Sequence, residues 1–504
     1  MNNNTPKADV CLFLEGTYPY SSGGVSTWTH ELIQMQSHLT FNIVTLLREG
    51  ADTAFAYKLP DNVLSVTPVF LQVLPEGKKS LAPHPTNQLF KTLEPALLNL
   101  QKDGSLSDLR KIIQALAPMR NDIGRHILFN SEEAWNMVLR IYQATMKENA
   151  FLDYFWSWRT LFGGMFSILL ADLPEADCYH ALCTGYAGLY LARAKIETGK
   201  PCIVTEHGIY TNERRIEISS ADWLEDKKAF SLSVQQEDAQ REMKDLWIDV
   251  FATYSRLCYE ASSSIVTLFE GNQPFQLMDG AEKNKLKVIA NGIDVERYAA
   301  VVKDTNHPPT IALIGRVVPI KDVKTFIKAV AILKESVPNL RALILGPMDE
   351  DQAYADECVS MVRHLKLDTT LEFTGKVSIA DYLPQIDVIA LTSLSEAQPL
   401  VLLEAGAAGI PTVSTNVGAC HEMLMGASDE SPKLGVGGAI CPLSNPRAIA
   451  ESAQKLLTDP EYYQQCCDVI KQRVAMYYHK NDQYTAYFDL YDEMLSPMVL
   501  KEAS

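Results

Sequence analysis

The sequence has few features of a secreted, metal-binding or membrane-spanning protein. Its ten cysteines are scattered without the spacing of a zinc site, and only Cys466 and Cys467 are adjacent. The N-terminal segment 1–7 is polar and has no apolar signal-peptide core. The longest apolar stretch, at about 161–173, is too short to span a bilayer as a helix. We therefore expect a cytoplasmic protein, which can still attach peripherally at the inner membrane through partner proteins.

Several common catalytic and cofactor motifs are missing as well. No Gly-x-Ser-x-Gly elbow, His-Glu-x-x-His metal motif or Walker A sequence occurs. The Gly-x-Gly-x-x-Gly fingerprint does not follow the first expected strand, so a nicotinamide cofactor is not supported. The net charge of -17 disfavours general affinity for nucleic acid or an anionic membrane surface. That charge leaves room for an anionic small molecule, which needs only a few cations in one cleft.

Short apolar runs alternate with longer amphipathic stretches, as in a doubly wound parallel sheet. The first series of expected strands is 10–14, 41–47, 178–182, 202–205 and 264–269. The second series is 311–314, 342–345, 371–373, 388–391 and 412–414. Two such series in a chain of 504 residues predict an α/β protein with two Rossmann-like domains.

The predicted domains are residues 1–300, residues 301–476 and a final helix within residues 477–504. Between about 51 and 171 no strand–helix rhythm is apparent, so we interpret this range as a helical insertion in the first domain. The segment Asn291-Gly292-Ile293-Asp294 and the polar residues after it are interpreted as a linker. In the final helix, aromatic side chains at helical spacing predict a stripe that faces a core, namely Tyr484, Tyr487, Phe488 and Tyr491.

Two glutamates flank the start of an expected helix in segment 395–405. Pro399 is placed to open this helix at its first position. Glu396 then lies in the preceding loop, and Glu404 lies one to two turns into the helix. Between them the helix presents free N–H groups and the positive end of its dipole, which suit a diphosphate. The spacing by itself fits an exposed pair on an ordinary helix equally well.

Segment 314–322 also follows an expected strand and precedes an expected helix, where open α/β sheets bind ligands. Within it, Arg316 and Lys321 can neutralise a diphosphate, the arginine by bidentate contact. Gly-Arg turns and lysines at helix starts are common, so this segment is a weak signal when taken alone.

Three features of the first domain are further candidates. Gly23 and Gly24 join the first strand to the first helix and would let the backbone approach a ligand closely, although a plain flexible turn fits as well. His207 closes a strand and can donate a hydrogen bond to a sugar hydroxyl, although most single histidines are structural or solvated. Arg214 and Arg215 follow closely and either meet an acceptor or cover the surface.

Taken together, these segments resemble the fourth family of retaining glycosyltransferases, which have two facing Rossmann-like domains. The paired glutamates, Gly315-Arg316 with Lys321, the 291–294 segment and the C-terminal aromatic helix occur in the expected order. The stretches 14–28 and 205–210 look closer still to the glycosyltransferases of Pel-type exopolysaccharide biosynthesis. The resemblance implies a GT-B fold with an inter-domain cleft and a C-terminal helix that crosses back to the N-terminal domain.

The resemblance also implies a role for each candidate. Arg316 and Lys321 would bind the diphosphate, and Glu404 would bind the ribose hydroxyls. Glu396 would contact the transferred hexose, and His207 would lie near it. The remaining candidates are the loop of Gly23 and Gly24 over the phosphate, and the weak acceptor contacts Arg214 and Arg215.

One departure from the family pattern concerns the phosphate loop. Many relatives have glycines where this chain has Ala397 and Pro399, and a proline offers no N–H. Backbone contacts to phosphate must then come from Leu400 or Val401. A proline in the first helical turn leaves these donors free, so the departure is tolerable.

The implied reaction moves a hexosyl unit from a UDP-sugar to a growing glycan with retention at the anomeric carbon. The expected partners are the UDP-sugar donor, the glycan acceptor and inner-membrane polysaccharide synthase subunits, with no nucleic acid. We expect no cofactor and no metal, because the cations and the helix dipole neutralise the leaving group. Two alternatives stay open: a nucleotide-sugar epimerase of the same architecture, and a non-catalytic nucleotide-binding subunit of an assembly complex.

Overall fold

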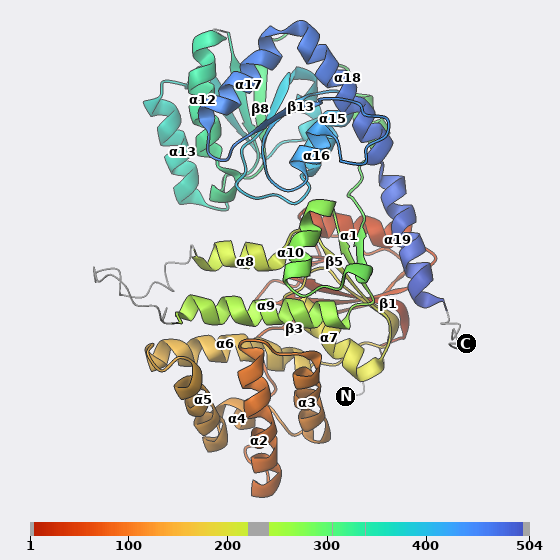
Figure 1. Cartoon of the computed structure of the whole chain (residues 1–504), viewed down its shortest axis with the longest axis vertical. Coiled ribbons are helices and arrows are strands. Elements are labelled where there is room, and N and C mark those ends of the chain that lie inside the picture. Colours follow the sequence, from red (N-terminus) through yellow and green to blue (C-terminus); the bar gives the residue numbers. More distant parts are fainter. Residues whose placement is uncertain (1–4, 220–240, 305, 338, 497–504) are drawn as a thin grey trace. The chain divides into compact units, whose positions relative to one another are not determined.

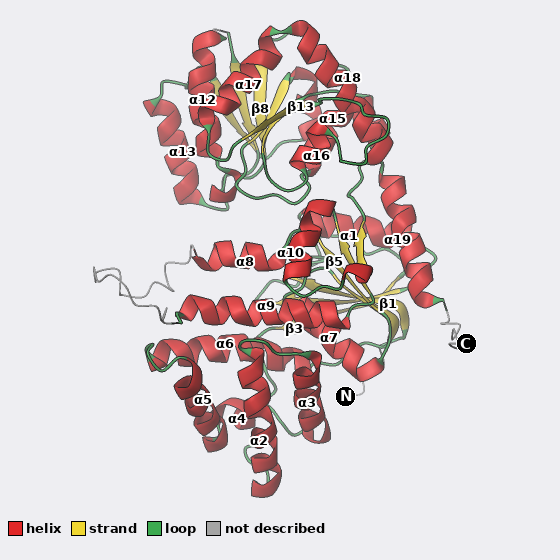
Figure 2. Cartoon of the chain, viewed as in Figure 1, coloured by secondary structure: helices red, strands yellow, loops and turns green. Residues whose placement is uncertain are grey.

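The computed structural model describes residues 5–219, 241–304, 306–337 and 339–496. The chain folds into two compact units, each built on its own parallel sheet (Figure 2). The first unit comprises the described residues of Met1–Thr267, Gln273–Val288 and Phe488–Ser504, and the second comprises those of Leu268–Asn272 and Ile289–Tyr487. Among these described residues, no helix is long and apolar enough to cross a membrane.

The first unit contains a seven-stranded parallel sheet in the order β3-β2-β1-β4-β5-β6-β7. Its order reverses between β1 and β4, the type of position where open α/β sheets bind ligands outside the carboxyl ends of the strands. The strands are β1 Ala8–Glu15, β2 Phe41–Leu47, β3 Val63–Phe70, β4 Ala176–Ala181, β5 Cys202–Glu206, β6 Ser264–Thr267 and β7 Leu286–Val288.

Helices cover both faces of this sheet, which explains the near-continuous apolar strands. Every residue of β2, β5 and β6 is buried, as expected for parallel strands packed on two sides. The helices that belong to the strand–helix alternation are α1 Gly24–Met35, α7 Tyr186–Thr198, α8 Tyr210–Ser219, α9 Met243–Ala261 and α10 Gln273–Met278.

Between β3 and β4 the chain forms a helical subassembly, drawn in orange to brown in Figure 1. Helix α2 packs against α3 and α5, while α6 packs against α7 and α9. The side chains of these helices share one hydrophobic core with the sheet. The helices are α2 Pro83–Leu100, α3 Leu106–Leu116, α4 Arg125–Asn130, α5 Glu132–Thr145 and α6 Phe151–Leu170.

The second unit contains a six-stranded parallel sheet in the order β10-β9-β8-β11-β12-β13. Its order reverses between β8 and β11, so the ends of these two strands define the ligand-binding position of this sheet. The strands are β8 Thr310–Ile314, β9 Arg341–Leu345, β10 Leu371–Gly375, β11 Val388–Leu391, β12 Thr412–Thr415 and β13 Gly438–Cys441.

Several helices of the second unit begin at recognisable capping residues. The side chains of Asp322, Asp351, Asn445 and Asp459 each accept a hydrogen bond from a backbone N–H in the first turn of the helix that follows. The helices are α11 Val295–Ala299, α12 Val323–Ser336, α13 Gln352–His364, α14 Ile379–Tyr382, α15 Leu400–Ala407, α16 Cys420–Met425, α17 Pro446–Thr458 and α18 Pro460–Tyr477. The last helix, α19 Lys480–Leu495, begins in the second unit and ends in the first.

The structure differs from the predicted boundaries in three places. Strand β3 lies within the range predicted as an insertion (51–171) and belongs to the first sheet, so the inserted helices begin only at α2. The boundary predicted at residue 300 lies inside the second unit, which resumes at Ile289. The segment predicted as a linker contributes Ile293 to a β-bridge with His479 in the second unit.

The predicted C-terminal helix is α19, which begins at Lys480, because Tyr477 ends α18. Tyr487 and Tyr491 are fully buried, as the predicted stripe requires. Phe488 is an error of that prediction: its side chain is 45% exposed, with its ring beside that of His38. Residues 497–504 of the predicted final segment lie outside the described residues.

Candidate functional site

The carboxyl ends of β8 and β11 bring two predicted residues into contact. Lys321 ends the short turn after β8, and Glu396 lies in the loop after β11. The Lys321 Nζ lies 2.5 Å from Glu396 Oε1. Ser393 Oγ donates to the same carboxylate oxygen at 2.6 Å. Both charged side chains are largely enclosed, with 23% of Lys321 and 14% of Glu396 exposed, so their attraction is screened less than that of a surface pair.

The loop that carries Glu396 is fixed by neighbouring backbone. Thr415 Oγ1 donates to Ser393 O at 2.7 Å, and Ala419 N donates to Ala397 O at 2.7 Å. Gly418 adopts a φ of +50°, and a Cβ at this position would lie 2.2 Å from the carbonyl oxygen of Ala397. The close approach therefore requires glycine. These contacts preorganise the carboxylate without any ligand.

Helix α15 follows this loop and carries Glu404. Pro399 is the N-cap and not the first helical residue, so the predicted position is shifted by one. Leu400 and Val401 then occupy the first turn, where backbone N–H groups have no acceptor within the helix. Glu404 accepts a hydrogen bond from the Tyr298 hydroxyl at 2.9 Å. Burial raises the pKa of Glu404, which the Tyr298 hydrogen bond partly opposes.

Arg316 is engaged elsewhere in this structure. Its Nη1 forms an ion pair with Glu350, on the loop after β9, at 2.5 Å from Oε1 and 2.8 Å from Oε2. Both side chains are about half exposed, so the pair is weak and exchangeable. Any contact between Arg316 and a diphosphate would thus compete with Glu350.

Three residues near the glutamate pair were not predicted. Gln398 Oε1 accepts from Asn291 N at 2.7 Å, so its buried side chain ties the loop to the segment that precedes α11. Ser393 holds Glu396, and Tyr298 holds Glu404, as described above. Of these three residues, only Gln398 lies between the two glutamates in sequence, and this position could have marked it as part of the site. Tyr298 is remote from Glu404 along the chain, and nothing in its local sequence marks it.

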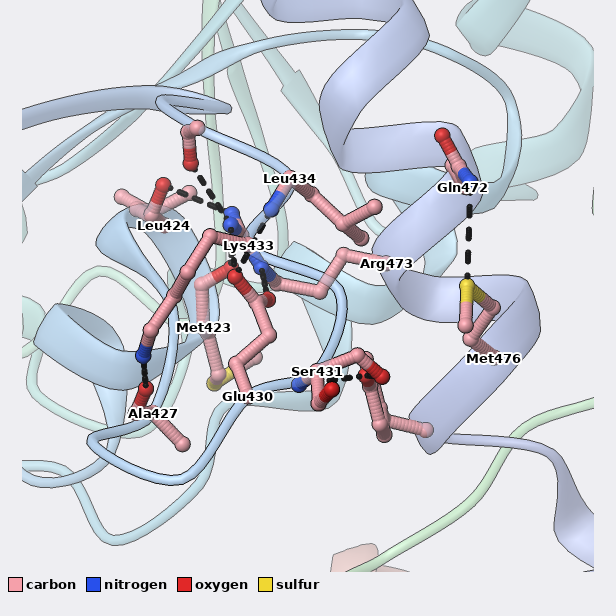
Figure 3. Close-up of polar contacts among 12 residues, drawn as sticks. Met423, Leu424, Ala427, Glu430, Ser431, Lys433, Leu434, Gln472, Arg473 and Met476 are labelled. Carbon is pink, nitrogen blue, oxygen red and sulfur yellow. Dashed lines mark hydrogen bonds and ion pairs between the residues drawn. The ribbon is translucent and has the colours of Figure 1, made fainter.

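A buried ion pair supports the neighbouring loop 426–437 (Figure 3). Arg473, on α18, donates from Nε to Glu430 Oε1 at 2.5 Å and from Nη2 to Gly435 O at 2.6 Å. Its Nη1 donates to Leu424 O at 2.9 Å. Contact with Arg473 lowers the pKa of Glu430. Because the guanidinium donors are used internally, we assign this cluster to the framework and not to ligand binding.

In the first unit, the predicted turn after β1 and the end of β5 are both at the carboxyl edge of the sheet. Gly23 is the N-cap of α1, and Gly24 is its first residue. His207 lies directly after β5 and packs edge-on against Trp28 of α1, with ring centroids 4.6 Å apart. Burial lowers the pKa of His207 to about 4. Its Nε2 atom is buried and has no hydrogen-bond partner among the described residues.

Two carboxylates at the same edge were not predicted. Glu15 Oε1 accepts from Ala187 N, at the start of α7, at 2.9 Å. Glu206, next to His207, is buried and accepts from the Tyr259 hydroxyl at 2.7 Å and from Gln276 Nε2 at 2.8 Å. Burial raises the pKa of Glu206 to about 7. These carboxylates tie the strand ends to α7, α9 and α10 and so support the surface around His207.

Arg214 and Arg215 lie on α8, and Arg215 is the more exposed of the two. The guanidinium of Arg214 lies 4.9 Å from the ring centroid of Tyr210, a cation–π contact that holds it against the helix. Arg215 is exposed. The weak acceptor prediction is therefore better suited to Arg215 than to Arg214.

Possible metal ligands are sparse in the described ranges. No group of three or more His, Cys, Asp or Glu side chains there is arranged to hold a metal ion. The sequence Asp349-Glu350-Asp351 has the Asp-x-Asp spacing of some metal motifs, but Glu350 pairs with Arg316 and Asp351 caps α13. Metal independence stays a prediction.

Solved structures identify the class of fold. The Anabaena protein Alr3699/HepE, in complex with UDP, matches with a TM-score of 0.59 at 14% identity, over 96% of this chain and 99% of that chain. Sucrose-phosphate synthase from Thermosynechococcus elongatus matches with a TM-score of 0.58 at 14% identity, over 96% of this chain and 98% of that chain. The two parallel-sheet units are thus the Rossmann-like domains of the GT-B glycosyltransferase fold.

Comparison with protein families shows to which family the chain belongs. Residues 8–284 match a family described as a domain of unknown function (DUF3492), and residues 294–473 match the glycosyl transferases group 1. The first of these matches covers more than half of the chain, so the chain belongs to the DUF3492 family.

Two curated relatives are similar over part of the chain. D-inositol 3-phosphate glycosyltransferase of Kribbella flavida is 27% identical over 217 residues, which is 40% of this chain and 47% of the relative. Glycogen synthase of Mycobacterium tuberculosis is 26% identical over 230 residues, which is 45% of this chain and 53% of the relative. The chain spans about half the length of these relatives.

Proposed function

We propose that the protein is a retaining glycosyltransferase that moves a hexosyl unit from a UDP-sugar to a growing glycan. The observation that carries this proposal is the contact of Lys321 and Ser393 with Glu396 at the switch point of the second sheet. A fixed cation and a fixed carboxylate at that position suit a leaving diphosphate and a sugar hydroxyl, respectively. The UDP donor is supported by the UDP present in the HepE structure of the same fold.

The transition state would resemble an oxocarbenium ion as the diphosphate leaves. The Lys321 ammonium would stabilise the charge that develops on the leaving phosphate, together with the N–H groups of Leu400 and Val401 at the start of α15. Arg316 would add to this charge stabilisation after it exchanges Glu350 for phosphate. The leaving phosphate would accept the proton of the acceptor hydroxyl on the same face of the sugar.

The two glutamates would serve different parts of the donor. Glu396 would orient the hexose through its hydroxyls, because its position is fixed by Lys321 and Ser393 before the donor binds. Glu404 would accept from the ribose hydroxyls in place of, or beside, Tyr298. In the first unit, the loop of Gly23 and Gly24 would close over the phosphate, and His207 would contact the sugar, as the family resemblance implies.

The finer assignment places the enzyme in Pel-type exopolysaccharide biosynthesis and biofilm formation. It is supported by the sequence stretches 14–28 and 205–210. On this proposal the acceptor is a nascent glycan, and polysaccharide synthase subunits at the inner membrane are the partners. No metal is needed in the proposed reaction, because Lys321 and the helix N-terminus supply the positive charge.

The decisive experiment is a panel of nucleotide sugars assayed for donor hydrolysis and for transfer, with product stereochemistry read by NMR. We expect turnover of UDP-sugars and an α-linked product from an α-linked donor. Release of an epimerised monosaccharide without an acceptor would establish the epimerase alternative. UDP binding without turnover of any donor would establish a non-catalytic nucleotide-binding subunit. In a turning-over enzyme, Glu396→Gln should lower kcat more than it lowers UDP affinity.

A further inference from the structure

A cavity of about 460 Å³ lies in the first unit, on the flank of the sheet away from His207. Its size is within the range of about 300–1,000 Å³ that ligand sites occupy. Glu49, shortly after β2, and Gln72, shortly after β3, form one wall. Because β1, β2 and β3 run parallel, this wall is at the same carboxyl edge as the turn that carries Gly23 and Gly24.

The opposite wall comes from the inserted helices and combines cations with aromatic rings. Arg125 is the first residue of α4, and Phe129 lies one turn later in the same helix. Trp156 and Arg159 lie on α6, and the Trp156 side chain is 60% exposed. The Arg159 guanidinium lies 4.9 Å from the ring centroid of Phe129, which orients it.

The two arginines are not neutralised by the protein. Neither guanidinium forms an ion pair with another residue in the described part of the chain, and Arg159 has only a long hydrogen bond of 3.5 Å to Asn130 Oδ1. Burial and the nearby Arg125 charge both lower the pKa of Arg159. Of the two carboxylates at the cavity, Glu76 is largely exposed and its Oε2 lies 3.1 Å from His126 Nε2. Glu49 remains as an acceptor for hydroxyl groups.

The wall that carries Arg125 is rigid. Arg125 N donates to Pro75 O at 2.8 Å, and His126 N donates to Glu76 O at 3.2 Å. A Cβ on Gly124 would lie 2.0 Å from Pro75 O, so the loop after β3 packs directly on the start of α4. These contacts fix the start of α4, and with it the backbone position of Arg125, against the loop after β3.

We propose that this cavity binds an anionic sugar unit of the acceptor glycan, and this inference rests on the proposed glycosyltransferase function. Arg125 and Arg159 suit a carboxylate or phosphate group through charge-assisted, bidentate hydrogen bonds. The exposed Trp156 face suits the apolar face of a sugar ring, and Glu49 and Gln72 suit its hydroxyls. The position at the carboxyl edge would let a polymeric acceptor extend from the turn after β1 across the ends of β2 and β3.

The inference can be tested by calorimetric binding to the full chain at low salt. The probes are trigalacturonate for a carboxylate source, glucose 6-phosphate for a phosphate source, and maltotriose as the neutral control. We expect one of the anionic probes to bind at least tenfold more tightly than maltotriose and to weaken as salt increases. Arg159→Gln and Arg125→Gln should each weaken that probe by roughly tenfold or more.

Two matched variants control for general effects on charge and aromatic surface. Arg140→Gln removes an exposed arginine that pairs with Glu94 on the same group of helices, and it should leave probe binding unchanged. Trp156→Ala should weaken the anionic probe, whereas Trp135→Ala, which removes another exposed tryptophan, should not. Thermal unfolding of each variant checks that the fold is retained.

The outcomes separate this inference from the proposed function. Equal binding of all probes, or binding that both arginine variants retain, would overturn the anionic sugar site even if the wild-type protein turns over a UDP-sugar. A wild-type protein that turns over no donor but binds the anionic probe through Arg125 and Arg159 would overturn the proposed enzyme and leave the carbohydrate site standing.

Discussion

Lys321 and Glu396 are separated by 75 positions in sequence, yet they meet through one hydrogen bond at the ends of β8 and β11. The sequence predicted both as ligand contacts because each follows an apolar run that ends in a turn. It did not predict that Ser393 donates a hydrogen bond to the same Glu396 oxygen, or that Arg316 forms an ion pair with Glu350. Side-chain partners of this kind depend on how separate loops approach each other, which local patterns do not encode.

The role of Lys321 can be tested by removing its charge. Lys321→Ala should reduce affinity for UDP and lower turnover by at least tenfold, because it removes the cation next to the proposed diphosphate position. Calorimetry with UDP and a donor hydrolysis assay measure the two effects. Lys324→Ala is the matched control, because Lys324 lies on the same segment but pairs with Glu357. Normal UDP affinity in Lys321→Ala would contradict the assignment.

The protonation of His207 is a second prediction for a single residue. Burial disfavours the charged imidazolium, so the imidazole should titrate near a pKa of about 4 and stay neutral at pH 7. The unfolded chain binds a proton at its ordinary pKa of about 6.5, so this histidine removes stability as pH falls from there towards 4.

NMR of ¹³C-labelled histidines across pH 4–8 would measure the His207 pKa, and His207→Asn would assign the signal. Urea unfolding at pH 7 and pH 5 should show a smaller loss of stability in His207→Asn than in the wild type. Titration of His207 near pH 6.5 would show that its surroundings do not disfavour the charged imidazolium, and would contradict this prediction.

At the scale of secondary structure, every missed strand lies at a sheet edge, although one edge strand, β10, was predicted. β3 and β7 are the two edges of the first sheet, and β13 is an edge of the second. β3 is half-buried along most of its length and contains Pro68, a residue tolerated at sheet edges. Central parallel strands show continuous apolar runs that sequence patterns detect, whereas short or half-buried edge strands show them less often.

The close approach of Gly418 to the loop that carries Glu396 can be tested by substitution. Gly418→Ala should destabilise the protein by more than the roughly 1 kcal/mol expected for a positive φ alone, because its Cβ would meet two carbonyl oxygens of the Glu396 loop. Donor turnover should fall with stability, since Glu396 must move. Chemical denaturation and the hydrolysis assay measure both quantities.

Gly409→Ala separates backbone strain from the steric clash. Gly409 also has a positive φ, of +75°, but an added Cβ would meet only a flexible lysine side chain at 3.8 Å. We expect Gly409→Ala to lower the free energy of unfolding by about the amount expected for a positive φ alone, and to leave turnover unchanged. Equal effects on stability and turnover in both variants would contradict a special role for the close approach at Gly418.

At the scale of the whole molecule, each unit has hydrophobic core residues of its own. The core of the first unit joins the sheet to the inserted helices, while the second unit has separate clusters around its sheet and around α15 and α16. The two-domain organisation followed from the two series of apolar runs in the sequence. The sequence of the helical insertion does not predict the cavity, because Arg125 and Arg159 come together only when α4 and α6 pack beside the loop after β3.

Independent cores predict that UDP stabilises one unit selectively. We expect calorimetric unfolding to show two transitions, and saturating UDP to raise the one that belongs to the second unit. At a concentration of 100 times Kd the gain is about 2.7 kcal/mol for a ligand that binds only the folded state. Leu343→Ala, in the core of the second unit, and Leu191→Ala, in that of the first, identify the transitions, because each should lower its own. A UDP-dependent shift confined to the transition lowered by Leu191→Ala would place the nucleotide in the first unit and refute the assignment of Lys321 and Glu404.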